Sequence, residues 1–143
     1  MKFAKAMIIA GLLVAGAAYA ETAATDANVI ARQELMKGIG GAMKTLGGMA
    51  GGEMAYDAAA AEAAKAVLVA NSAEIAAKFE MNAVDPATKA KPEAWANWDD
   101  FVAKATALNA AATAMDAASA EGIGAGMGDV GGACKACHMA YKM

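Results

Sequence analysis

The sequence is short of the residues that cross-link or interrupt a chain. Its 143 residues include two cysteines, two prolines and one histidine. Aromatic residues make up 6% of the chain, and the β-branched runs that are typical of strands are scarce. So few cysteines exclude a disulfide scaffold, and so little proline leaves long helices uninterrupted. The residues that abound are alanine, Met, Lys, Glu and Leu, which favour helix.

The chain also lacks an excess of positive charge. It has 12 Lys and Arg against 15 Asp and Glu, a formal net charge of −3. An acidic surface argues against nucleic acid and against anionic lipid as partners. It suits a basic patch on a partner protein instead.

One long apolar run lies at the N-terminus. Lys2 and Lys5 give the run at 6–18 a positive start, and Ala18-Tyr19-Ala20 offers the small residues that a signal peptidase reads. A retained membrane anchor is the alternative, but the run is shorter than the ~20 residues that cross a bilayer. We therefore predict that residues 1–20 are a cleaved signal peptide. No membrane span then remains.

The mature chain, 21–143, is predicted to form one domain. Its apolar residues recur at steps of three and four, the spacing of an amphipathic helix. Short breaks separate four such segments, at 26–50, 54–79, 92–120 and 122–143. Short connections and seven-residue repeats predict an all-α, antiparallel, left-handed four-helix bundle.

Glycine is unusually frequent in the first and fourth segments, although each glycine costs a helix about 1 kcal/mol relative to alanine. Two interpretations are open. The glycines allow a backbone or a flat ligand to approach closely, or long helices simply tolerate them.

The final ten residues, CKACHMAYKM, hold both cysteines and the only histidine. On a helix, Cys134, Cys137, His138 and Tyr141 project from one face. Two cysteines three residues apart on a helix make a poor disulfide that closes almost no loop. The cluster therefore predicts a different use.

Three uses of CxxCH compete. Structural zinc normally takes four protein ligands, and this chain offers three. A redox dithiol prefers the start of a helix, whereas this pair lies near a helix end. Covalent haem attachment has CxxCH as its signature. The motif therefore favours haem c, with Cys134 and Cys137 as thioether anchors and His138 as the proximal iron ligand.

Five further residues are candidates for the haem site. Arg32 stands on an apolar stripe without an obvious acid beside it, so we expect it to meet a haem propionate, with Gln33 beside it; the alternative is that Arg32 reaches solvent. Met36, one turn on, is a candidate distal iron ligand or a filler of the core. Tyr141 and Lys142 either set the proximal surroundings or lie on the surface.

The segments GDVGGACKACHMAYK (128–142), RQELMK (32–37) and KPEAW (91–95) resemble parts of the class II c-type cytochromes, the group of cytochrome c prime and its low-spin relatives. The resemblance spans the mature chain. It implies a periplasmic, commonly dimeric haem protein that carries electrons. It also implies that Arg32 meets a propionate and that Lys142 lies near the proximal face, where arginine is more usual and hydrogen-bonds differently.

The family divides at the sixth position of the iron. Cytochrome c prime has an apolar distal cap and binds small gases, whereas the low-spin relatives use a methionine; the stretch at 35–61 is more similar to the low-spin branch. The leading hypothesis is thus a single-haem electron carrier with redox partner proteins, not an enzyme. The alternatives are a binder of nitric oxide or carbon monoxide, and a zinc module.

Overall fold

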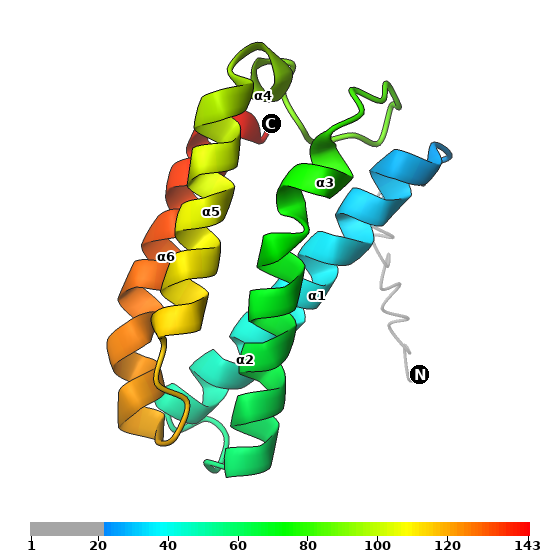
Figure 1. The fold of residues 1–143 in the computed structure, drawn as a ribbon. Coiled ribbons are helices and arrows are strands. Elements are labelled where there is room, and N and C mark those ends of the chain that lie inside the picture. Colours follow the sequence, from blue (N-terminus) through cyan, green and yellow to red (C-terminus); the bar gives the residue numbers. More distant parts are fainter. Residues whose placement is uncertain (1–21) are drawn as a thin grey trace, which may run out of the picture.

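The computed structural model describes residues 22–143. The predicted signal peptide at 1–20 lies outside the described residues. The helices are α1 (Ala27–Ala50), α2 (Ala58–Ala73), α3 (Ile75–Phe79), α4 (Glu93–Ala96), α5 (Trp98–Ala114) and α6 (Ala120–Tyr141). The long helices run alternately down and up the bundle in the order α1, α2, α5 and α6, and the short α3 continues the direction of α2 (Figure 1). The predicted all-α four-helix bundle is confirmed.

Three of the long helices begin at a residue whose side chain caps them. Asp26, Asp57 and Ser119 precede α1, α2 and α6, and each accepts a backbone N–H of the first turn at 2.7–3.0 Å. Such caps satisfy N–H groups that have no partner within the helix. They explain why α2 begins at Ala58, later than its apolar pattern predicts.

Two predicted helices differ from the structure in their continuity and length. The second is interrupted at Glu74, whose N–H bonds to the carbonyl of Asn71 at 3.2 Å, three residues back. The third is interrupted at Asn97 and ends at Ala114 rather than near residue 120. The chain becomes extended at Met115, which is 2% exposed. Leaving the helix there places this side chain in the core.

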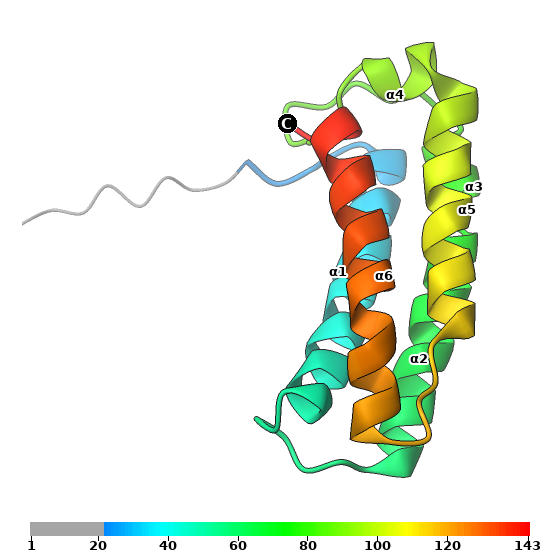
Figure 2. The ribbon, with the colours of Figure 1, turned by 90° about the vertical axis from the view of Figure 1, so that its left-hand side faces the viewer.

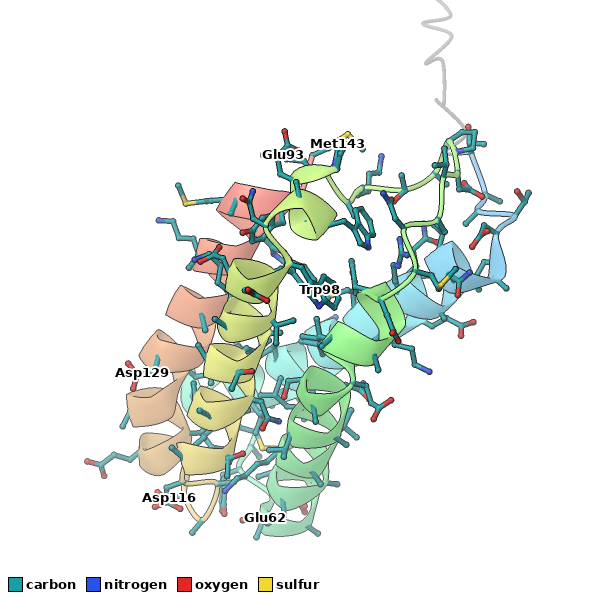
Figure 3. All side chains as sticks on the ribbon, turned by 45° about the horizontal axis from the view of Figure 1, so that its top comes forward. Glu62, Glu93, Trp98, Asp116, Asp129 and Met143 are labelled. Atoms are coloured by element: carbon teal, nitrogen blue, oxygen red, sulfur yellow. The ribbon has the colours of Figure 1, made fainter. Side chains whose placement is uncertain are left out.

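The core follows the predicted stripes. Leu46, Leu68, Ile123 and Val130 have no exposed surface. At the end of the bundle that carries α3 and α4, an aromatic cluster continues the core. The ring centroid of Phe101 lies 5.1–5.5 Å from those of Phe79, Trp98 and Tyr141. Figure 3 shows the Trp98 side chain in the space between α5 and α3.

The loop at 80–92 lies beside the C-terminus at this end of the bundle (Figure 2). The Lys91 N–H donates to the carbonyl of Tyr141 and the Met143 N–H to that of Lys89, both at 2.8 Å. These bonds fix the end of α6 against the loop. None of the helices in residues 22–143 is long and apolar enough to cross a membrane.

Candidate functional site

A cavity of about 800 Å³ lies among α1, α5, α6 and the loop before α4. Ligand pockets typically span about 300–1,000 Å³, so this one has room for a cofactor. All eight residues predicted for the site line it: Arg32, Gln33, Met36, Cys134, Cys137, His138, Tyr141 and Lys142. The fold therefore brings together residues from opposite ends of the sequence.

The helix α6 presents the CxxCH motif to the cavity. Both cysteines are half-buried free thiols. Burial raises the pKa of Cys134 and of Cys137, which is the opposite of a reactive redox pair. His138 is exposed but borders the cavity. Partial desolvation there, and then the charge of Lys142, lowers the pKa of His138 and favours the neutral imidazole that binds metals. Within residues 22–143 no three His, Cys, Asp or Glu side chains form a metal site, so zinc gains no support.

Arg32 is buried, with 4% of its surface exposed, and does not reach solvent. Its Nε donates to the Lys78 carbonyl at 3.1 Å and its Nη2 to the Met81 carbonyl. Its guanidinium carbon lies 5.0 Å from the ring centroids of both Phe79 and Trp95. Burial lowers its pKa, and the charge of Asp26 acts in the opposite direction.

Nη1 of Arg32 is buried and has no hydrogen-bond partner among the described residues. An unpaired buried donor on a charged group is costly. Arg32 also lines the cavity, and an anion bound within reach of Nη1 would supply the missing acceptor. Sequence reasoning anticipated that this arginine needs a partner. It missed the two aromatic rings and the two carbonyls, which no local pattern indicates.

Gln33 and Met36 form the neighbouring wall on α1. The Nε2 of Gln33 donates to the Ala87 carbonyl at 3.2 Å, which ties this wall to the loop. Met36 is partly buried and lines the cavity together with Ile39 and Met43. This wall is thus mostly apolar.

Tyr141 is buried, at 7% exposure, so it is not a surface residue. Its hydroxyl donates to the Asp100 carboxylate, and this bond raises the pKa of Tyr141 to about 12. Asp100 also accepts from Lys104 at 3.2 Å. Sequence reasoning missed Asp100 because nothing in its local pattern sets it apart. Lys142 is exposed beside the cavity.

The residues present fit haem. The cavity has apolar walls, two thiols one helical turn apart and a neighbouring imidazole, as covalent attachment and iron ligation require. Its lining residues include Arg32 and four lysines, Lys37, Lys89, Lys104 and Lys142, but no carboxylate. Such a lining suits a flat apolar ring that carries two carboxylates.

Comparison with known proteins decides the family. A family model described as Cytochrome C' matches residues 27–142. The chain belongs to the cytochrome c' family. It is 34% identical to cytochrome c-556 of Agrobacterium fabrum, over all of this chain and 96% of that protein. It is 43% identical to cytochrome c-556 of Agrobacterium tumefaciens strain apple 185, over 79% and 92% of the two chains.

The solved structures agree on the fold of this cytochrome. It is similar to cytochrome c' from Rhodobacter spheriodes, with a TM-score of 0.73 and 32% identity over 81% of this chain and 95% of that one. The protein is thus a single-haem class II cytochrome. Its cofactor is haem c, which the family binds covalently through a cysteine pair, and Cys134 and Cys137 are the pair that this chain has.

Proposed function

We propose that this cytochrome carries single electrons between redox proteins in the periplasm, as a homodimer and not as an enzyme. The observation that carries the proposal is that one cavity of about 800 Å³ is lined both by the CxxCH residues of α6 and by buried Arg32, whose Nη1 has no hydrogen-bond partner among the described residues. Bound haem c supplies the one-electron redox chemistry. The protein residues bind, orient and shield it.

Each side chain then has a distinct role. Cys134 and Cys137 hold the cofactor by thioether bonds, and His138 ligates the iron on the proximal side. Arg32 pairs with a propionate through Nη1, and Gln33 borders the same place. Together these residues would hold the cofactor through its vinyl carbons, its iron and a propionate.

The aromatic and hydrogen-bonded surroundings keep the site rigid. The rings of Phe79 and Trp95 both lie against the Arg32 guanidinium, so little side-chain freedom is lost when an anion binds. The Tyr141–Asp100 bond anchors the end of α6 next to His138. A rigid site suits electron transfer, because the surroundings change little with redox state.

The role of Met36 distinguishes the electron carrier from the alternative, a protein that binds a small gas. As distal ligand it completes the iron coordination and leaves no place for a gas. As a mere neighbour, with Ile39 and Met43, it leaves an apolar wall that suits nitric oxide or carbon monoxide. The relatives include proteins named cytochrome c-556 and proteins named cytochrome c', so their names favour neither.

Optical spectra of the reduced holoprotein test the proposal. We expect a sharp α band that carbon monoxide does not change, because Met36 occupies the sixth position. Met36→Ala should give a broad high-spin spectrum that shifts with carbon monoxide. Met43→Ala, a cavity-lining methionine two turns further along α1, is the matched control and should keep the wild-type spectrum. A wild-type protein that binds carbon monoxide would instead establish the gas binder.

The role of Arg32 is tested by redox titration. We expect Arg32→Ala to retain covalent haem but to have a lower midpoint potential, because a positive charge near the haem favours the reduced state. Lys44→Ala removes an exposed charge of the same helix outside the cavity lining and should leave the potential unchanged. If both variants have the midpoint potential of the wild type, Arg32 does not belong to the haem site.

A further inference from the structure

The residues just before α1 form part of the cavity wall. Thr22, Ala23 and Ala24 line the cavity, although they belong to no helix. An extended segment without a helical ladder stays in place only if other groups hold it. The structure shows one such group.

That group is the carboxylate of Asp85, in the loop before α4. Its Oδ2 accepts the N–H of Thr25 at 2.8 Å, the hydroxyl of Thr25 at 3.1 Å and the N–H of Asp26 at 2.9 Å. Asp85 is 5% exposed. Bonds to an ionised carboxylate are about twice as strong as neutral ones, so a single buried acceptor can hold the segment.

The other oxygen of the same carboxylate holds a second wall. Oδ1 accepts the N–H of Ala87 at 2.7 Å, which closes a turn over Pro86. The carbonyl of Ala87 in turn accepts from Gln33. Asp85 therefore connects the segment at 22–26, the loop and α1, although it does not line the cavity itself.

We propose that Asp85 is a positioning residue of the haem site: its carboxylate latches residues 22–26 as a strap along the cavity and holds the turn against which Gln33 rests. The strap and the turn keep water from the cofactor. The inference rests on the proposed placement of haem in this cavity. It adds a residue outside the haem motif and outside the cavity lining.

The test compares two variants that conserve charge. Asp85→Glu keeps the negative charge, but its longer side chain cannot place its oxygens at the same four donors. Asp116→Glu is the matched control, because Asp116 accepts from Ala118 in the same kind of turn at 2.9 Å. Asp116 lies at the opposite end of the bundle from Met143 (Figure 3).

Two measurements on the holoprotein report the latch and its effect. Amide hydrogen exchange at Thr25 and Asp26 should become at least about tenfold faster in Asp85→Glu, because strong hydrogen bonds to a charged acceptor are lost. The haem midpoint potential should fall, because water reaching the haem stabilises the charge that the iron gains on oxidation. Asp116→Glu should change neither quantity.

Each other outcome overturns the inference. Unchanged exchange at Thr25 and Asp26 would mean that Asp85 is not the latch. Faster exchange with an unchanged potential would make Asp85 a staple of the fold without a role at the haem. If Asp85→Glu fails to fold, Thr25→Val removes one of the bonds to Oδ2 without altering charge, and both quantities should move in the same directions by smaller amounts; no movement would overturn the proposal.

The two failures have different readouts and are therefore distinguishable. A protein whose mass shows no covalent haem would refute the proposed function. In a protein that carries covalent haem, unchanged exchange at Thr25 and Asp26 would refute the latch alone.

Discussion

The guanidinium of Arg32 lies against two aromatic rings and has carbonyl groups as acceptors, yet one of its nitrogens has no partner among residues 22–143. At the scale of single residues, the protein surrounds a buried charged group with hydrogen-bond partners at more than one position. Asp85 is the anionic counterpart, with four donors around one carboxylate. Buried charges are tolerated where hydrogen bonds replace water.

The hydrogen bonds to Asp85 predict a specific dependence of stability on pH. They lower its pKa from 3.8 to about 2, with the N–H of Asp26 as the largest cause, followed by those of Ala87 and Thr25. Because the folded pKa lies below the unfolded one, the stabilisation is complete above about pH 4 and is lost as the pH falls toward 2. Urea unfolding between these values should show a falling free energy for the wild type and a flatter profile for Asp85→Asn. Parallel profiles would contradict the prediction.

At the scale of elements, caps and breaks decide where helices begin and end. Asp57 starts α2 after the apolar pattern has already begun, and Met115 ends α5 while the pattern continues. The glycines of α6 also differ from one another in the space around them. A Cβ on Gly126 would lie 3.0 Å from Cγ of buried Met115 and 3.3 Å from its Cα, whereas one on Gly128 would meet nothing within 4 Å.

These two glycines make a matched pair within one helix. Gly128→Ala should raise the free energy of unfolding by about 1 kcal/mol, because alanine favours the helix. Gly126→Ala should be less stable than Gly128→Ala by about 1–3 kcal/mol, because the extra methyl overpacks the contact with Met115. Chemical denaturation of both holoproteins measures the difference. Equal stabilities would mean that Met115 moves aside for the added methyl group at no cost in free energy.

At the scale of the whole molecule, the cavity is too large for the bundle to keep empty. Its walls are largely apolar and surround about 800 Å³ that opens to solvent at His138 and Lys142. Without a bound group, water would contact apolar side chains there, and exposed apolar surface lowers stability. The cofactor is therefore part of the core as well as the redox group.

The size of the cavity predicts the behaviour of the protein without attached haem. The double variant Cys134→Ala/Cys137→Ala should retain helical circular dichroism but lose its near-ultraviolet signal and its cooperative thermal transition. Met139→Ala, on the same helix but exposed, should attach haem and melt cooperatively. A cooperative transition in the haem-free double variant would show that the bundle closes its own core.

Several features could be predicted from the sequence because they are local. Helical periodicity depends on spacing within one segment, and the bundle followed from four such segments with short breaks. The CxxCH motif places its ligands within five residues, so the linear order of side chains is enough to infer haem. Arg32 was conspicuous because a charge on an apolar stripe needs a partner.

Only the tertiary structure decided what surrounds those residues. Phe79, Trp95 and Asp100 meet Arg32 or Tyr141 across distances in sequence that no local pattern bridges. Asp85 holds residues 25 and 26 for the same reason. The sequence by itself determined the helices and the cofactor, because both depend on short-range spacing. The packing of distant segments decided which side chains form the walls of the site, because such contacts exist only once the chain has folded.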